Sequence, residues 1–145
     1  PKTCDFTSQA TNVKYIPVDF KRSGMNPFAD LKYMLTLWRI YYHERPDYIF
    51  HYTIKPNIYG SIAAWMCHIP STAMIAGLGY VFTNQSLGSK IARALYRFAM
   101  RFPQHVFVLN NYNAQLILEK KIASSRQLIL LPGGEGVNLL HFNNN

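Results

Sequence analysis

The chain has 145 residues, of which 49% are hydrophobic and 14% aromatic, with 15 Lys and Arg against 7 Asp and Glu. This length fits one compact domain with a sizeable core, and the composition excludes intrinsic disorder. The net charge of +8 predicts an anionic partner, and charge alone leaves nucleic acid, a phospholipid surface and a phosphorylated substrate open.

Cysteine usage and hydrophobic patterning narrow the class further. Cys4 and Cys67 have no C-x-x-C spacing, and no secretory leader opens the chain, so we expect reduced, buried thiols in an intracellular protein. A single disulfide between them is the less favoured alternative. Residues 56–89 carry no charge, but prolines, glycines and polar residues interrupt every apolar window of the about 20 residues that a membrane span needs. We therefore expect a soluble or peripheral protein.

The predicted elements alternate along the chain. Residues 13–18 (VKYIPV) read as a strand, and Asn26-Pro27 is typical of a helix start, with the helix ending before Pro46. Further predicted elements are a strand over 47–52, a helix from 56, a strand over 71–76, a helix over 90–102, a strand from 105, a helix over 114–122 and a strand from 127. This alternation predicts an α/β fold, a Rossmann-like parallel sheet with helices on both faces.

Polar side chains follow the strand over 47–52, where the sequence reads HYTIKPN. In open parallel sheets, ligands bind outside the carboxyl ends of the strands, so His51, Thr53 and Lys55 are predicted at the ligand edge. Lys55 and the free N–H groups of the next helix would bind an anion, and His51 could bond a sugar hydroxyl or a phosphate, or transfer a proton. The alternative is that His51 caps the strand and Lys55 is a solvated charge.

Two glycines, Gly77 and Gly79, directly follow the strand over 71–76. Glycine there allows close approach of a ligand to the backbone, although an ordinary β-α turn explains it equally well. The spacing matches neither G-x-G-x-x-G nor a P-loop. The seven acidic residues form no D-x-D motif, and H-x-x-x-H is also absent, so we expect no metal site.

Two of the predicted helices have an unusual distribution of side chains: one has its cations on a single face, and the other is apolar or aromatic around most of its circumference. Four cations of the helix over 90–102 fall within about 80° of arc: Lys90, Arg93, Arg97 and Arg101. This basic stripe suits an anionic membrane, a nucleic-acid backbone or plain solvation. The helix from Asn26 has only a narrow polar arc, so its Tyr33, Tyr41 and Tyr42 could meet a second domain, another subunit, lipid or this domain's own core.

Several blocks together resemble the family 4 glycosyltransferases of bacterial capsule, O-antigen and exopolysaccharide biosynthesis. The blocks are RSGMNPFADL, RPDYIFHYTIKPNIYGSIAA, AGLGYVFTN, ALYRFAM, VFVLNN and LPGGEGVNLLHF, spread over about residues 15–142. The resemblance implies the two-domain GT-B fold and a retaining, metal-independent transferase without a cofactor. Such enzymes extend a saccharide on undecaprenyl diphosphate with a sugar from a nucleotide-sugar.

The resemblance also implies the place of this chain and of its residues. Residues 1–145 would be part of the amino-terminal, acceptor-side domain, without its first strand and glycine loop and without the donor domain, and inactive alone. The acceptor or its phosphates would be bound by His51, Thr53, Lys55, Asn57, Gly77, Gly79 and Tyr80. The interdomain glycine turn would be Gly133, Gly134, Glu135 and Gly136, although LPGGEGVN has Gly-Glu where the family often has a single Ser.

The basic stripe would face the cytoplasmic side of the bacterial membrane, and no nucleic acid would bind. The competing hypothesis is a non-catalytic basic Rossmann-like module that docks on an anionic membrane or on nucleic acid. A flavodoxin-like cofactor domain is disfavoured, because the phosphate-binding fingerprint is missing.

Overall fold

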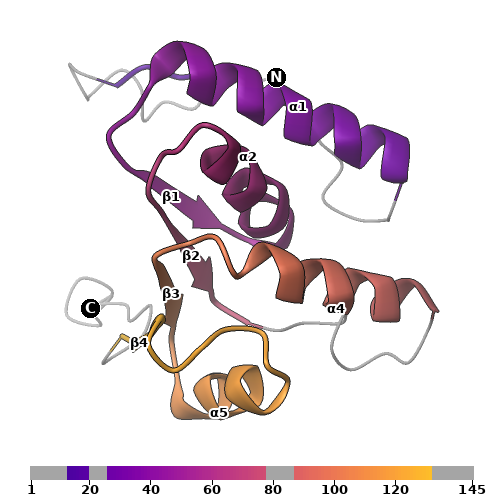
Figure 1. Ribbon diagram of the computed structural model, residues 1–145, viewed down its shortest axis with the longest axis vertical. Coiled ribbons are helices and arrows are strands. Elements are labelled where there is room, and N and C mark those ends of the chain that lie inside the picture. Colours follow the sequence, from indigo (N-terminus) through magenta and orange to yellow (C-terminus); the bar gives the residue numbers. More distant parts are fainter. Residues whose placement is uncertain (1–12, 20–25, 78–86, 132–145) are drawn as a thin grey trace, which may run out of the picture.

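The computed structural model describes residues 13–19, 26–77 and 87–131 (Figure 1). Helices and strands alternate from β1 onward, as the sequence predicts. The helical elements are α1 (Pro27–Glu44), η2 (Pro56–Gly60), α2 (Ser61–Met66), α4 (Leu87–Ala99) and α5 (Asn111–Glu119). The strands are β1 (Ile49–Tyr52), β2 (Ser71–Ile75), β3 (His105–Val108) and β4 (Leu128–Leu130).

The four strands form one parallel sheet in the order β1-β2-β3-β4. This confirms the predicted α/β class. Consecutive right-handed crossovers that all step in the same direction place their helices on the same face of a sheet. Figure 1 shows this arrangement, with α2, α4 and α5 in a row beside the strands. We expected helices on both faces, whereas the helices of the described ranges cover one.

The opposite face of the sheet carries half-exposed apolar side chains. Phe50 of β1 is 52% exposed, and its ring centroid lies 6.1 Å from that of Phe107 on β3. Ile129 of β4 is next to Phe107 in the register and is also exposed. β1 and β3 are therefore buried mainly on their helix-covered side, whereas all five residues of β2 are buried.

The main core lies between the sheet and its helices. Val106 and Val108 of β3 are completely buried, as are Met100 after α4 and Ile117 of α5. They belong to one cluster that also includes Ile58, Ala73, Ile75, Tyr96, Ala99, Ile122 and Ala123. Burying an aliphatic side chain stabilises a fold by about 1.5–3 kcal/mol, so this cluster fixes where the helices sit above the sheet.

Helix α1 packs on η2 and α2. It begins as predicted, because the Asn26 Oδ1 atom accepts hydrogen bonds from the backbone N–H groups of Phe28 and Ala29. Tyr33 and Leu37 are buried against Ala63, which forms a second, smaller core cluster. Part of the aromatic face of this helix is thus contact within the domain, while Tyr42 and Phe28 stay exposed.

The predicted strand over residues 13–18 is wrong. These residues have no regular secondary structure and pair with none of the described strands. A strand requires hydrogen bonds to a neighbour, which an apolar alternation cannot supply by itself. Elsewhere the predicted boundaries shift by up to about three residues. No helix within the described ranges is long and apolar enough to cross a membrane.

Candidate functional site

A cavity of about 180 Å³ opens beyond the carboxyl ends of β1 and β2. This is the sheet edge where the sequence analysis predicts a ligand. The cavity is smaller than the about 300–1,000 Å³ of pockets for drug-sized ligands, so it fits a small group such as one sugar residue. Its walls are formed by Tyr52, Thr53, Ile54, Asn57, Met74, Ile75, Ala76, Gly77 and Tyr96.

Thr53 turns the chain from β1 into the following helical segment. Its φ angle is 74°, in the left-handed region, which a β-branched residue rarely adopts. The turn is closed by a hydrogen bond of 3.0 Å from the backbone N–H of Asn57 to the carbonyl of Thr53. Such strained residues concentrate at functional sites, where the surrounding structure holds them in place.

Asn57 lies at the wall of the cavity and is 1% exposed. Its Nδ2 atom donates to the carbonyl of Met74, at 2.8 Å, and to the hydroxyl of Tyr96, at 3.1 Å. Its Oδ1 atom is buried and has no hydrogen-bond partner among the residues that the structure describes. A buried acceptor without a donor costs about 1–3 kcal/mol, so the side chain is poised to accept a hydrogen bond from a ligand or a water molecule.

His51 is buried on the helix-covered face of β1 and does not line the cavity. Its Nε2 atom lies 3.2 Å from the Tyr41 hydroxyl, and its Nδ1 atom lies 3.4 Å from the Ser61 hydroxyl. A Cβ atom added at Gly60 would come within 2.6 Å of the His51 ring. Burial lowers the pKa of His51 to about 4, so the ring is neutral near pH 7.

Lys55, two residues after Thr53, is held by an ion pair with Asp30 of α1. Its Nζ atom donates to Asp30 Oδ1 at 2.7 Å, and the Tyr59 hydroxyl donates to Asp30 Oδ2 at 3.1 Å. The side chains of Lys55 and Asp30 are 13% and 9% exposed. The cation expected to bind an anion is thus neutralised by a carboxylate from the first turn of α1.

The predicted acceptor-binding residues that the structure describes therefore fall into two groups, those that line the cavity and those that bond other side chains of the protein. Thr53, Asn57 and Gly77 line one cavity, whereas His51 and Lys55 have protein partners beside it. Gly79 and Tyr80 lie outside the described residues, as does the predicted glycine turn at 133–136. The contacts of these residues with an acceptor stay predictions.

Two residues that form this region were not predicted from the sequence to belong to it. Tyr96 projects from the buried face of α4 and bonds Asn57, and Asp30 pairs with Lys55. Asp30 lies in the first turn of a helix, where an acid is common, so it gave no signal of its own. Tyr96 lies on the apolar side of α4, where an aromatic residue predicts core.

The cations of α4 do not all share one environment. Lys90, Arg97 and Arg101 are exposed, and Arg93 is partly buried. Their role at a membrane stays a prediction.

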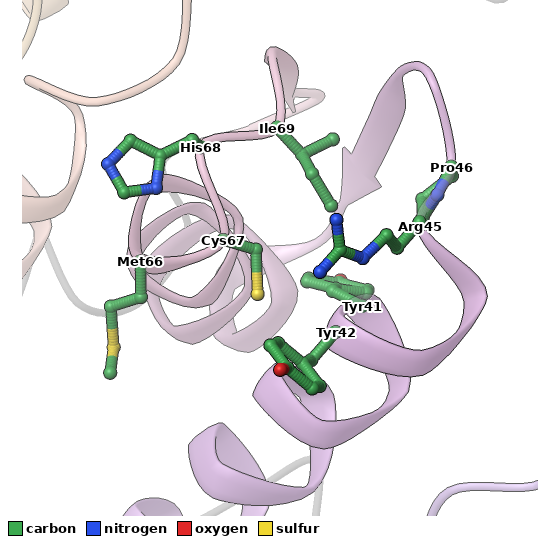
Figure 2. Close-up of a pocket in the computed structure, with 8 residues that line it drawn as sticks. All are labelled: Tyr41, Tyr42, Arg45, Pro46, Met66, Cys67, His68 and Ile69. Carbon is green, nitrogen blue, oxygen red and sulfur yellow. The ribbon is translucent and has the colours of Figure 1, made fainter.

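A larger cavity of about 420 Å³ lies at the opposite edge of the sheet, before the amino ends of β1 and β2. Figure 2 shows its lining: the Arg45 guanidinium lies by the Tyr41 and Tyr42 rings, with Cys67 at the end of α2. Cys67 is a free thiol whose pKa is raised by burial. This cavity lies away from Thr53 and from the Oδ1 atom of Asn57, and two residues with a left-handed φ line it as well, Arg45 at 43° and His68 at 58°.

No group of three metal-binding side chains occurs in the part of the chain that the structure describes. The arrangement offers a hydrogen-bond acceptor, backbone groups and a tyrosine hydroxyl. It can therefore bind a neutral, hydroxyl-bearing ligand.

A parallel α/β sheet with a pocket beyond the carboxyl ends of its strands defines a Rossmann-like ligand-binding domain. Comparison with known proteins gives the family: the chain belongs to the family described as Glycosyl transferase 4-like, which matches residues 2–110. This confirms the resemblance to family 4 glycosyltransferases.

The chain is also similar to an enzyme of Campylobacter jejuni, the N,N'-diacetylbacillosaminyl-diphospho-undecaprenol alpha-1,3-N-acetylgalactosaminyltransferase. The two sequences are 27% identical over 135 residues, which cover 90% of this chain and 35% of that enzyme. The chain thus spans about a third of the length of this relative.

Proposed function

We propose that this chain is the acceptor-side part of a glycosyltransferase that adds a sugar from a nucleotide-sugar to a saccharide on a polyprenyl diphosphate. The family match and the name of the Campylobacter relative support the reaction class. They also favour it over a non-catalytic basic module. In this proposal, residues 1–145 form part of the acceptor domain, transfer retains the anomeric configuration without a metal, and the enzyme works at the inner face of the cytoplasmic membrane.

The observation that carries the acceptor assignment is the unpartnered Oδ1 atom of Asn57 at the cavity wall. A sugar hydroxyl donates a hydrogen bond, whereas the oxygens of a diphosphate ester only accept. The nearest predicted cation, Lys55, is occupied by Asp30 and does not line the cavity. The cavity therefore suits the saccharide of the acceptor rather than its diphosphate.

His51 and Lys55 act in this proposal as positioning residues. Together with Tyr41, Ser61 and Asp30, they fix the backbone on both sides of Thr53. The strained turn then presents Thr53 and Asn57 to the acceptor in one arrangement. A preorganised site of this kind avoids the entropy cost of ordering the loop on binding.

Calorimetric titration with a short-chain polyprenyl-diphosphate saccharide tests the assignment. Nothing lies within 4 Å of a Cβ atom added at Gly77, so Gly77→Ala should bind normally, while Gly77→Leu should fill the cavity and abolish binding. Asn57→Ala should weaken binding about 10-fold through loss of one hydrogen bond. Equal affinity in the Gly77 series would refute the assignment, even if Asn57→Ala failed to fold.

A further inference from the structure

The cavity of about 420 Å³ at the amino edge of the sheet, which we call the amino-edge cavity, has no part in the proposed function. None of the residues that line it lines the cavity at the carboxyl edge. Pockets for small molecules typically enclose about 300–1,000 Å³ and combine apolar walls with a few polar groups. The amino-edge cavity is therefore large enough for a small molecule, and its lining indicates which kind.

Two helices end at the amino-edge cavity, and a residue with a left-handed backbone follows each of them. Arg45, directly after α1, has a φ of 43°, and His68, two residues after the end of α2, has a φ of 58°. Glycine is the usual residue at such a position, because it has no Cβ atom to clash with the backbone. Here both positions instead carry side chains with N–H donors, and both side chains line the cavity.

The Arg45 guanidinium is the main charged group of the amino-edge cavity. It lies over the Tyr42 ring, with its Cζ atom 5.4 Å from the ring centroid, and in the view of Figure 2 it extends toward Cys67. No ion pair within the described ranges includes Arg45. A guanidinium presents five N–H donors in one plane, which match the paired oxygens of a carboxylate or a phosphate.

The rest of the lining favours an apolar body. The Tyr41 hydroxyl lies 3.2 Å from Nε2 of His51, and the Cys67 Sγ atom lies 3.7 Å from the carbonyl oxygen of Trp38, so both groups already have partners in the protein. The aliphatic part of the lining is Pro46, Met66 and Ile69. The described lining contains no Asp or Glu, so no carboxylate of the cavity wall repels an anion.

We infer that the amino-edge cavity is a second ligand site, which binds a small molecule with a carboxylate or phosphate group on a flat apolar ring. The oxyanion pairs with the Arg45 guanidinium, and the ring packs against Tyr41 and the aliphatic side chains of the lining. His68, on the other side of Cys67 in Figure 2, offers a further donor. This inference does not depend on the proposed function, because the two cavities share no lining residue.

A ¹H–¹⁵N NMR titration with matched probes tests the requirement for an anion and a ring. Benzoate and phenyl phosphate carry an oxyanion on a ring, benzamide has the ring without the charge, and acetate has the carboxylate without the ring. We expect both ring anions to shift the backbone amides of Arg45, Cys67, His68 and Ile69, and benzamide and acetate to bind about 10-fold more weakly. The ring anion that binds more tightly identifies the source of the ligand as a carboxylate or a phosphate ester. Benzamide binding as tightly as both ring anions, or no shift at these amides, would overturn the inference.

Variants of Arg45 locate the oxyanion. Arg45→Gln should weaken benzoate binding about 10-fold, to the affinity of benzamide, and Arg45→Lys should restore only part of the loss because it lacks the planar donors. Arg39→Gln is the matched control: it removes the same charge from an exposed position of α1 that does not line the cavity, and it should bind benzoate as wild type does. Equal benzoate affinity in Arg45→Gln and Arg39→Gln would refute the site.

Alkylation of Cys67 gives a second readout that leaves the cavity unchanged. The sequence has two cysteines, so the variant Cys4→Ser leaves Cys67 as the only thiol. Cys67 is a free, partly exposed thiol in the cavity lining, so a bound ring covers it. Benzoate at about ten times its Kd should slow the reaction with iodoacetamide about 10-fold, and benzamide at the same concentration about 2-fold, since the free fraction of sites falls as 1 + [L]/Kd rises. An unchanged rate with benzoate would overturn the inference, even if Arg45→Gln failed to fold.

Discussion

Thr53 holds a backbone conformation that its own side chain disfavours. A φ of 74° brings a β-branched side chain close to its backbone, at a cost of about 1–3 kcal/mol. The cost is tolerated because β1 ends one residue earlier and the Asn57 N–H bonds the Thr53 carbonyl. Because Thr53 lines the cavity, this strain is located where a precise turn would serve binding.

Replacing Thr53 by glycine should therefore raise the stability of the protein. We expect Thr53→Gly to increase the free energy of unfolding by about 1 kcal/mol, since glycine adopts this φ without strain. The matched control is Thr36→Gly in the middle of α1, which should lower stability by about 0.5 kcal/mol. Urea denaturation measures both. A loss of stability in Thr53→Gly would show that the turn is not strained.

His51 makes stability depend on pH. Its pKa is about 4 in the folded protein and about 6.5 in the unfolded chain, so the unfolded chain binds more protons between these values. Stability therefore falls as the pH decreases from 6.5 to 4 and is unaffected by this group above 6.5.

At pH 5, this linkage should lower the free energy of unfolding by about 2 kcal/mol relative to pH 7. The variant His51→Gln should lose most of that difference, although it is less stable at pH 7. Denaturant titrations of both proteins at the two pH values provide the comparison. Identical pH dependence in the two proteins would mean that His51 is protonated in the folded state or exposed.

At the scale of the element, η2 joins β1 to α2 by a single π-helical turn. Its last residue, Gly60, lies against the His51 ring, so the close approach of helix to strand depends on the missing side chain. π-helical turns inside helices are often found at functional sites. Here the turn brings Asn57 to the end of β2, where it bonds the Met74 carbonyl.

We expect Gly60→Ala to lower the free energy of unfolding by about 1–3 kcal/mol, because its Cβ atom would overlap the His51 ring. Gly77→Ala is the control, since a Cβ atom there meets nothing within 4 Å. In a His51→Ala background the Gly60→Ala penalty should shrink, which a double-mutant cycle detects. Equal, small effects at both glycines would contradict the packing described for η2.

Element types were largely predictable from the sequence, and side-chain orientation was not. Asn26-Pro27 predicted the start of α1, and alternating strands and helices predicted the parallel sheet. His51 could not be oriented, because alternate residues of a strand face opposite sides and both sides were expected to be covered. In the structure His51 faces the helices beside Ala73, while Phe50 faces away.

The sequence predicted where the candidate site lies, but it identified only some of the residues that form it. Thr53, Asn57 and Gly77 follow the two strands whose ends form the cavity. The pairing of Lys55 with Asp30 joins residues 25 positions apart, and the bond of Asn57 to Tyr96 joins residues 39 apart. Contacts at such separations depend on how helices pack, and no local pattern specifies them.

For the whole molecule, the two cavities lie at opposite edges of the sheet and differ in the charge of their lining. The cavity at the carboxyl edge has no charged residue in its described lining, whereas Arg45 lines the larger cavity of Figure 2 at the amino edge. The described residues that line the predicted ligand site include no Lys or Arg, so the excess positive charge of the chain lies elsewhere.

The most direct test of the central claim is a ¹H–¹⁵N NMR titration of this protein with a water-soluble acceptor saccharide. Our account predicts shifts of the Asn57 side-chain amide and of the backbone amides of Thr53 and Gly77, with little response to nucleotide-sugars. Shifts at Cys67 and His68 instead, or tight nucleotide binding without a response to the saccharide, would contradict the assignment of the carboxyl-edge cavity as the acceptor site.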